Sequence, residues 1–331
     1  MYFDGHSELR PDFRLHRTTV SALTDLLWPR DHQGWGRHLD TLVFLFWLAS
    51  GTSYRVVARA FDIPRSTVCD VAHRVADQIL SIRRRLISFP PAEELEDIST
   101  GFQQLGGCAS FQRVVGAIDG CHVRIKPPAE HAECYLNRKL FHSVQFQAVT
   151  DHQGRFLDIF AGYPGSVHDS RVLRNSPIYK EQLYPPASFV LLGDGGYPCL
   201  SRPITILTPY RQPVRNPVEA RFNRHHSRAR SVVERAFGIM KARWRAIFFK
   251  ALEVQPTFAV KVIACCAVLH NLCLRHGDLL EPEPVQEPET EAVHHEQDNQ
   301  GQQSGESLRA AMAAALSAPR ERHQALRDHD Y

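Results

Sequence analysis

The order of strand-type and helical segments after residue 108 constrains the fold more than any other feature of this 331-residue sequence. Runs of β-branched and aromatic residues predict strands at 113–126, 144–150, 156–161, 189–192 and 205–207. A turn at 151–154 makes the second and third strands a hairpin, and the fully apolar fourth is typical of a strand buried on both faces. Helices are expected at 168–175, 227–249 and 257–274. Antiparallel strands, then a buried strand and then helices predict a mixed α/β layer fold.

Residues 1–100 show the apolar spacing of helices. A short helix at 53–61, a turn at 62–64 and a second helix continuing to about residue 82 form the outline of a helix-turn-helix. On the second helix Arg65 and Arg74 suit phosphates and base edges, whereas Asp70 and Asp77 do not. An ordinary helical hairpin remains the alternative.

Charge is distributed unevenly along the chain. The formal net charge is +3, but residues 281–331 hold 11 acidic and 4 basic residues, which leaves +10 on residues 1–280. A basic body with an acidic tail favours a polyanionic partner. We expect an all-α region over 1–100, a mixed α/β domain over 108–276 and a mostly disordered tail over 277–331.

Two further expectations concern basic and tail segments. The tail carries an alanine-rich stretch at 307–316 that is expected to form a short isolated helix, and a chain ending at Gly277 is expected to fold. The run Arg83-Arg84-Arg85 is either a solvated charge run or a nuclear-import patch.

Several protein classes do not fit. The longest uninterrupted apolar run, 42–49, is far shorter than the roughly 20 residues of a membrane helix. The first five residues lack a basic-then-apolar pattern, so no secretory signal is expected. Eight cysteines without paired Cys-x-x-Cys motifs indicate reduced thiols in the nucleus or cytosol. His270 and Cys273 have metal-ligand spacing, but their apolar segment favours a core role.

Four acidic residues stand in unusual contexts. Asp119 interrupts an apolar strand, Asp194 follows the buried strand, Asp169 lies in the helix at 168–175, and Glu234 lies beside the apolar stripe of the helix at 227–249. Three of them also fit an ordinary structural role without a metal. Asp194 fits a turn residue, Asp169 a helix cap, and Glu234 the ion-pair partner of Arg230, four residues earlier. A buried carboxylate is costly unless it is paired or binds a cation. Together the four predict a site for Mg²⁺ or Mn²⁺.

The stretch from Tyr210 to Lys250 holds 11 Lys or Arg and 2 acidic residues, and Glu234 lies within it. Cation-binding carboxylates among arginines suit a phosphodiester backbone, because arginines bind phosphates while metal ions polarise one of them. The residues therefore favour a nucleic-acid substrate.

Six sequence blocks, taken in order, identify a family. They are residues 117–123 (Ala-Ile-Asp-Gly-Cys-His-Val), 135–139 (Tyr-Leu-Asn-Arg-Lys), 162–170 (Gly-Tyr-Pro-Gly-Ser-Val-His-Asp-Ser), 193–198 (Gly-Asp-Gly-Gly-Tyr-Pro), 208–210 (Thr-Pro-Tyr) and 230–238 (Arg-Ser-Val-Val-Glu-Arg-Ala-Phe-Gly). They resemble the nuclease domain of the PIF/Harbinger transposases and of the Harbinger transposase-derived nucleases of animals, over about residues 112–273.

The resemblance implies an RNase H-like fold with an Asp-Asp-Glu metal site. Asp119, Asp194 and Glu234 match the catalytic, metal-binding positions, and Asp169 matches a further acidic position that also binds metal. Arg138, Lys139 and Arg230 are the candidates for phosphate contacts. Gly195 stands where relatives often have Ser, a departure that leaves the ligands intact.

The function expected from these residues is that of a divalent-metal-dependent DNA endonuclease, using Mg²⁺ or Mn²⁺ in a two-metal mechanism. The resemblance also implies a separate Myb-like DNA-binding partner, and we expect the protein in the nucleus and also in the cytoplasm. Two rivals remain open. One is a domesticated transposase that acts as a non-catalytic DNA-binding or adaptor protein, and the other is a phosphatase with the same metal chemistry.

Overall fold

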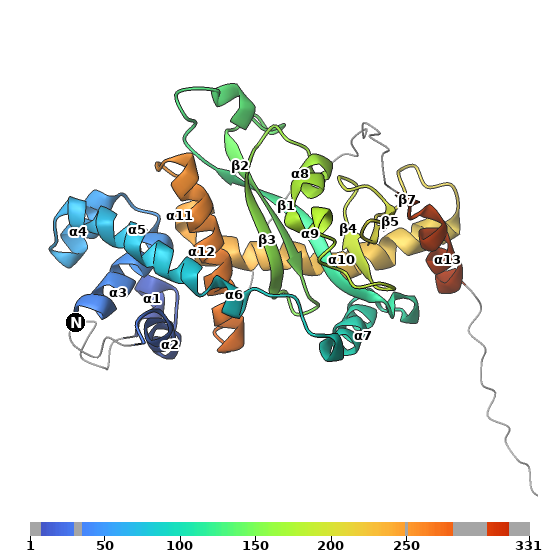
Figure 1. Ribbon diagram of the computed structural model, residues 1–331, viewed down its shortest axis with the longest axis horizontal. Coiled ribbons are helices and arrows are strands. Elements are labelled where there is room, and N and C mark those ends of the chain that lie inside the picture. The colour runs from blue at the N-terminus through green and yellow to red at the C-terminus, as the bar shows by residue number, and fades with distance from the viewer. Residues whose placement is uncertain (1–7, 30–34, 249–250, 281–302, 318–331) are drawn as a thin grey trace, which may run out of the picture.

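A seven-stranded mixed sheet forms the centre of the computed structural model, which describes residues 8–29, 35–248, 251–280 and 303–317 (Figure 1). The strand order is β3-β2-β1-β4-β6-β5-β7. The strands are β1 (Val114–Arg124), β2 (Ser143–Thr150), β3 (Phe156–Pro164), β4 (Val190–Gly193), β5 (Leu200–Arg202), β6 (Ile206–Leu207) and β7 (Gln303–Ser304). The sheet confirms the predicted mixed α/β fold.

The pairing of the first four strands follows from their sequence patterns. β2 lies antiparallel to β1 and β3, and the predicted hairpin joins β2 to β3. β4 runs parallel to β1 and to β6, and all four of its residues are buried, as the uninterrupted apolar run predicts. The candidate fifth strand is confirmed as β6, whereas β5 and β7 were not predicted.

Seven α-helices follow residue 94 within the described chain. They are α7 (Leu95–Gly106), α8 (Asp169–Asn175), α9 (Pro177–Lys180), α10 (Pro217–Arg243), α11 (Arg245–Phe248), α12 (Pro256–Arg275) and α13 (Glu306–Ser317). α10 crosses behind the strands in Figure 1, where it contacts β1, β2 and β4. α12 packs against β3 on one side and against the N-terminal helices on the other.

The predicted bounds of the long helix at 227–249 are wrong at both ends. α10 begins at Pro217, because the side chain of Asn216 accepts a hydrogen bond from the backbone N–H of Glu219 (3.0 Å) and Pro217 fits the first turn. α10 ends at Arg243, and Trp244 separates it from α11. The predicted apolar stripe is present, since Val233, Phe237, Met240 and Trp244 are all buried.

The described residues of the N-terminal region form helices and no strand. They are α1 (Arg10–Phe13), α2 (Arg17–Leu27), α3 (Trp35–Ser50), α4 (Tyr54–Phe61), α5 (Arg65–Ser81) and α6 (Arg83–Leu86). Three residues separate α4 from α5, as expected, but that this pair reads DNA stays a prediction. One contiguous apolar core joins these helices to the sheet through α12, so the predicted boundary near residue 108 does not divide two separate cores.

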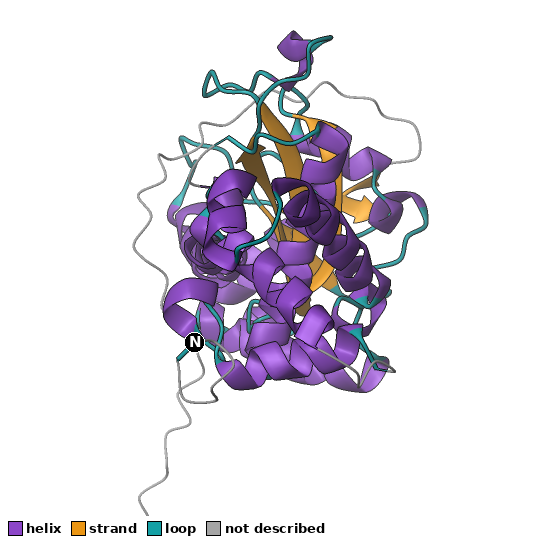
Figure 2. Ribbon diagram, turned by 90° about the vertical axis from the view of Figure 1, so that its left-hand side faces the viewer, coloured by secondary structure: helices purple, strands orange, loops and turns teal. Residues whose placement is uncertain are grey.

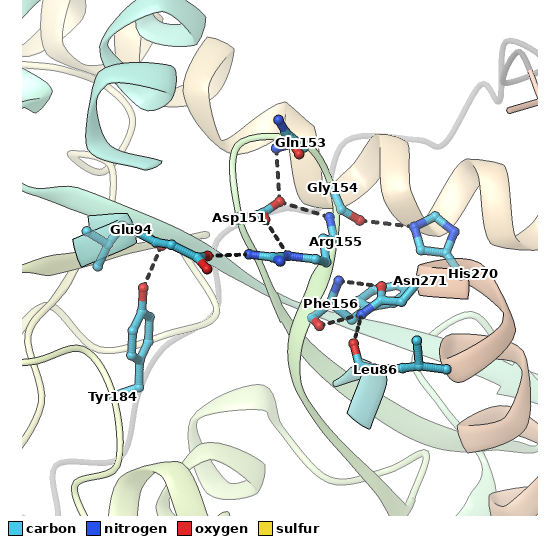
Figure 3. Close-up of polar contacts among 11 residues, drawn as sticks. Leu86, Glu94, Asp151, Gln153, Gly154, Arg155, Phe156, Tyr184, His270 and Asn271 are labelled. Atoms are coloured by element: carbon cyan, nitrogen blue, oxygen red, sulfur yellow. Dashed lines mark hydrogen bonds and ion pairs between the residues drawn. The ribbon is translucent and has the colours of Figure 1, made fainter. Parts of the chain in front are cut away.

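The turn between β2 and β3 is held by two buried polar groups from α12 (Figure 3). Asn271 bonds to the backbone N–H and C=O of Phe156 and to the C=O of Leu86, each at 2.8 Å. His270 Nε2 bonds to the C=O of Gly154 (3.0 Å), and burial lowers the pKa of its imidazole to about 4. His270 is therefore a core residue, which confirms the interpretation preferred from the sequence.

α12 has the length and hydropathy of a membrane span, a feature that the apolar-run argument missed. Of its 18-residue apolar window, 72% is buried inside the protein. Such burial is typical of the central helix of a folded core, so length and composition here are weak evidence for a membrane.

α13 is not the isolated helix that the sequence predicted. It packs against α10, its Ala313 is buried, and β7 pairs with β5 just before it. Arg309 reaches the carbonyl oxygens of Thr208 and Pro209 (3.3 and 3.2 Å). Residues 281–302 and 318–331 of the predicted tail lie outside the described part of the chain, so their predicted disorder stays a prediction.

Candidate active site

Two neighbouring parallel strands bring Asp119 and Asp194 together. Ile118 of β1 lies opposite Gly193, the last residue of β4, so the residue that follows each of them along the chain is one of these aspartates. The backbone N–H of Gly120 donates to Asp119 Oδ1 (2.8 Å), and that of Gly196 donates to Asp194 Oδ1 (2.9 Å). Each carboxylate is thus oriented by a backbone N–H one or two residues further along the chain, within β1 for Asp119 and just after β4 for Asp194, and keeps its second oxygen for another partner.

Asp169, the first residue of α8, reaches the same place. A Cβ atom on Gly120 would lie 2.5 Å from Asp169 Oδ1, and one on Gly196 would lie 2.9 Å from Asp169 Oδ2 and 3.0 Å from Asp194 Oδ1. Any side chain at these two positions would push the carboxylates apart. The two glycines therefore let three of the four predicted acidic residues converge.

The carboxylates of this cluster repel one another, and the pKa values of Asp119 and Asp169 are raised. Burial, and then the charge of Asp194, raise the pKa of Asp119 well above its usual value, and Arg230 opposes the shift. Burial and Asp194 also raise the pKa of Asp169 to about 7, against the lowering effect of Arg138. Carboxylates that repel one another in a buried place favour a proton or a cation between them.

Glu234 of α10 joins the cluster through Arg230. Arg230 donates to Asp119 Oδ2 (3.2 Å) and to Glu234 Oε1 (2.5 Å). The Arg230 side chain is 15% exposed and that of Glu234 50% exposed. The structure thus contains the pairing expected from the four-residue spacing and adds Asp119 to it, while a phosphate contact of Arg230 stays a prediction.

Three polar residues beside the carboxylates were missed from the sequence. Gln145 Nε2 donates to Asp169 Oδ1, and the hydroxyl of Tyr197 donates to Gln147 Oε1 (3.4 Å). Burial, then Asp169, Asp119 and Asp194, raise the pKa of Tyr197 well above its usual value, so the hydroxyl keeps its proton. A signal was present, since Gln145 and Gln147 interrupt a strand whose eight residues are all buried.

The predicted basic residues divide into two groups. Arg138 and Lys139 lie in the loop between β1 and β2, and Arg138 Nη2 contacts Nδ1 of His168 (2.6 Å), the residue before Asp169. Arg65 and Arg74 lie on α5, which α12 separates from the sheet (Figure 1). Arg74 is paired with Asp40 of α3 (2.8 Å). The structure therefore brings Arg138, but not Arg65 or Arg74, to the carboxylates.

The donor set fits a hard divalent cation. All four acidic side chains offer oxygen, the ligand that Mg²⁺ and Mn²⁺ prefer, and Gly120 and Gly196 keep the space between them clear. Within the part of the chain that the structure describes, however, no three His, Cys, Asp or Glu side chains form a group close enough to hold a metal ion. Because Arg230 pairs with both Asp119 and Glu234, a cation shared by these two has to displace it.

Comparisons with known proteins support a nuclease. Residues 118–271 match the family model described as "DDE superfamily endonuclease". "Putative nuclease HARBI1" of Rattus norvegicus is 30% identical over 250 residues, which cover 75% of this chain and 70% of the relative. The protein of the same name from Mus musculus is 30% identical over 263 residues, covering 77% of this chain and 74% of the relative.

A plant protein is similar at the same level. "Protein ALP1-like" of Arabidopsis thaliana is 30% identical over 257 residues, covering 72% of this chain and 61% of the relative, so the chain spans less than two thirds of that protein. No solved structure matches the chain significantly.

Proposed function

Because the chain belongs to the DDE superfamily endonucleases, with relatives of the Harbinger transposase-derived type, we propose that it hydrolyses phosphodiester bonds of DNA with divalent metal ions. The observation that carries the proposal is the convergence of Asp119, Asp169 and Asp194 where β1, β4 and α8 meet. A family match alone would say nothing of whether the acidic residues of this chain can act together.

The carboxylates have separate tasks in this proposal. Asp119 and Asp194, each oriented by a backbone N–H, hold the cations, Glu234 completes the set once it leaves Arg230, and Asp169 is a further ligand oriented by Gln145. Bound Mg²⁺ or Mn²⁺ supplies an activated water and stabilises the leaving oxygen. The strand order, with an antiparallel hairpin beside β1 and a parallel strand on its other side, supports an RNase H-like topology.

The basic residues near the site serve the DNA backbone. Arg138 and Lys139 bind phosphates next to the carboxylates, and Arg230 is released toward a phosphate when a cation replaces it. The exposed Arg65 at the start of α5 suits a second DNA contact, and Arg74 takes part only if it leaves Asp40. Nuclear and cytoplasmic location and a Myb-like partner belong to the same proposal.

The test is nicking of supercoiled plasmid DNA in Mg²⁺ or Mn²⁺. We expect cutting by the wild type and a loss of at least about a hundredfold in Asp119→Asn and Asp194→Asn, since each removes a charge that holds the metal ions. Asp158→Asn is the matched control, because Asp158 is a largely buried aspartate of β3 outside the cluster. Equal trace cutting by the wild type and Asp194→Asn would refute the proposal.

A second function is favoured by one observation, the position of Arg230 between Asp119 and Glu234. A protein that keeps this pairing permanently would bind DNA without cutting it and act as an adaptor. Tight DNA binding by the wild type with no cutting in either metal would support this function.

A further inference from the structure

A tight turn in the loop between β1 and β2 presents a leucine to solvent. The backbone N–H of Asn137 donates to Phe141 O (3.0 Å), and the N–H of Leu140 donates to Asn137 O (3.0 Å). These bonds close a loop of three residues, Arg138, Lys139 and Leu140. In both Figure 1 and Figure 2 the segment that joins β1 to β2 projects beyond the end of the sheet.

Leu140 is an unexpected residue at this position. Its φ angle is +58°, in the left-handed region that three-residue hairpin loops usually fill with glycine. Its side chain is 81% exposed, the largest exposed fraction among the large apolar side chains of the described residues. The leucine therefore buries almost no apolar surface and adds backbone strain, so it does not stabilise the folded chain, and we look for its role in binding.

Hydrogen bonds of Asn137 and a contact between Arg124 and Phe141 hold the turn in place. Asn137 is buried, its Nδ2 donates to Ser143 Oγ (3.1 Å), and its Oδ1 accepts the backbone N–H of Phe141 (3.2 Å). The guanidinium of Arg124 lies 4.4 Å from the ring centre of Phe141. Leu140 thus lies at the tip of a turn that is fixed by these contacts.

The surroundings of the leucine are cationic and adjoin the carboxylates. Arg138 and Lys139 precede it in the loop and are exposed, and Arg138 contacts His168 beside Asp169. Burial, and then the charges of Lys139, Lys241 and Arg138, lower the pKa of the His122 imidazole to about 4. A polyanion that reaches Asp169 therefore meets the turn as well.

We propose that Leu140 is a wedge that enters the base stack of duplex DNA held at the carboxylates, while Arg138 and Lys139 bind the flanking phosphates. This inference rests on the proposed function, since it takes DNA as the substrate. Apolar wedges of this kind unstack a base step and bend the duplex, which exposes the backbone. A protein surface is the less suitable occupant, because the apolar area is one side chain wide and follows two cations.

The experiment compares the binding of full-length protein to a short fluorescent duplex and to the same duplex with a central abasic site, in Ca²⁺ so that no strand is cut. The abasic duplex has already lost stacking at the centre, so we expect the wild type to bind it at least about fivefold more tightly. Leu140→Gly is expected to abolish this preference and to fold at least as stably, because glycine suits the left-handed turn. Leu140→Phe retains a wedge and should keep the preference.

Leu279→Ala is the matched control, because Leu279 is 59% exposed and lies beside Arg10 of α1, away from the carboxylates. Leu279→Ala should prefer the abasic duplex over the intact duplex to the same extent as the wild type. If Leu140→Gly still prefers the abasic duplex, the wedge is refuted. If a wild type that nicks plasmid DNA binds both duplexes equally, the wedge is also refuted, and Leu140 is assigned to a protein contact instead. Failure of the wild type to bind or nick any DNA would refute the proposed function itself.

Discussion

Replacing Arg230 tests whether the acidic cluster is a cation site. Arg230→Gln removes the positive charge that pairs with Asp119 at 3.2 Å and with Glu234. Breaking a buried ion pair costs about 3–5 kcal/mol. Since the side chains of Arg230 and Asp119 both remain 15% exposed, we expect the lower end, about 3 kcal/mol. For a chain of 331 residues that is a fall of about 4 °C in Tm in EDTA.

Divalent metal should reverse this loss. Mg²⁺ at about 100 times its Kd contributes about 2.7 kcal/mol to the folded state, close to what the variant has lost. The wild type should gain less than Arg230→Gln, because Arg230 competes with the ion for Asp119 and Glu234. The assay is thermal unfolding of both proteins in EDTA and across a Mg²⁺ titration.

Arg235→Gln is the control, since it removes the same charge from an exposed position of the same helix. It should lose little stability and respond to Mg²⁺ as the wild type does. An equal gain from Mg²⁺ in Arg230→Gln and the wild type would show that the ion binds elsewhere, and the reasoning would fail.

Three other predictions concern the fold and the DNA contacts. Asn271→Ala should lose roughly 3–5 kcal/mol of unfolding free energy in urea, because it leaves buried groups of Phe156 and Leu86 unpaired, whereas Asn175→Ala at an exposed bond should lose less than about 1 kcal/mol. Burial raises the pKa of Asp278, but the His16 N–H and Arg243 outweigh it and hold the pKa below its usual value. Asp278→Asn should therefore be less stable near pH 7, and the gap in Tm should close as the pH falls below about 4; a constant gap would contradict this. Lys139→Ala should lower the slope of log affinity against log salt by about one, and an unchanged slope would remove Lys139 from the DNA contact.

The sequence predicted those elements whose signal is local. β1 to β4 were found because apolar strand residues and a polar turn lie within a few positions of one another. β5 was missed because it has three residues and pairs with β6 at one position, Leu200 with Ile206. β7 was missed because it has two residues and pairs with β5 across about a hundred positions, Leu200 with Ser304. No periodicity can reveal so short a pairing.

Other misses had a readable signal. Asn216, Pro217 and Glu219 form a helix start, and their pattern could have placed the beginning of α10. Leu308, Met312 and Leu316 recur every four residues, which indicates that α13 has a face to bury. Asp278, just past the expected end of the folded part, is buried against Arg243 (3.2 Å), so a chain ending at Gly277 would lose that pair.

The candidate site was predicted in its residues but not in its connections. The unusual contexts of the four acidic residues grouped them as one cation site, and the spacing of Arg230 and Glu234 offered their ion pair as the alternative; that the four bind a metal stays a prediction. The bond from Arg230 to Asp119 joins residues 111 positions apart, and the contact of Arg138 with His168 depends on how two loops fold back. Such contacts arise only from tertiary structure.

The most direct test of the account is to locate the bound cation. With Fe²⁺ in place of Mg²⁺, ascorbate and peroxide generate radicals that cut the polypeptide beside the ion, and mass spectrometry identifies the new ends. We predict cuts near Asp119, Asp169, Asp194 and Glu234, suppressed by excess Mg²⁺ and lost in Asp194→Asn. Cuts at other places, or cuts unchanged in Asp194→Asn, would contradict a shared cation site.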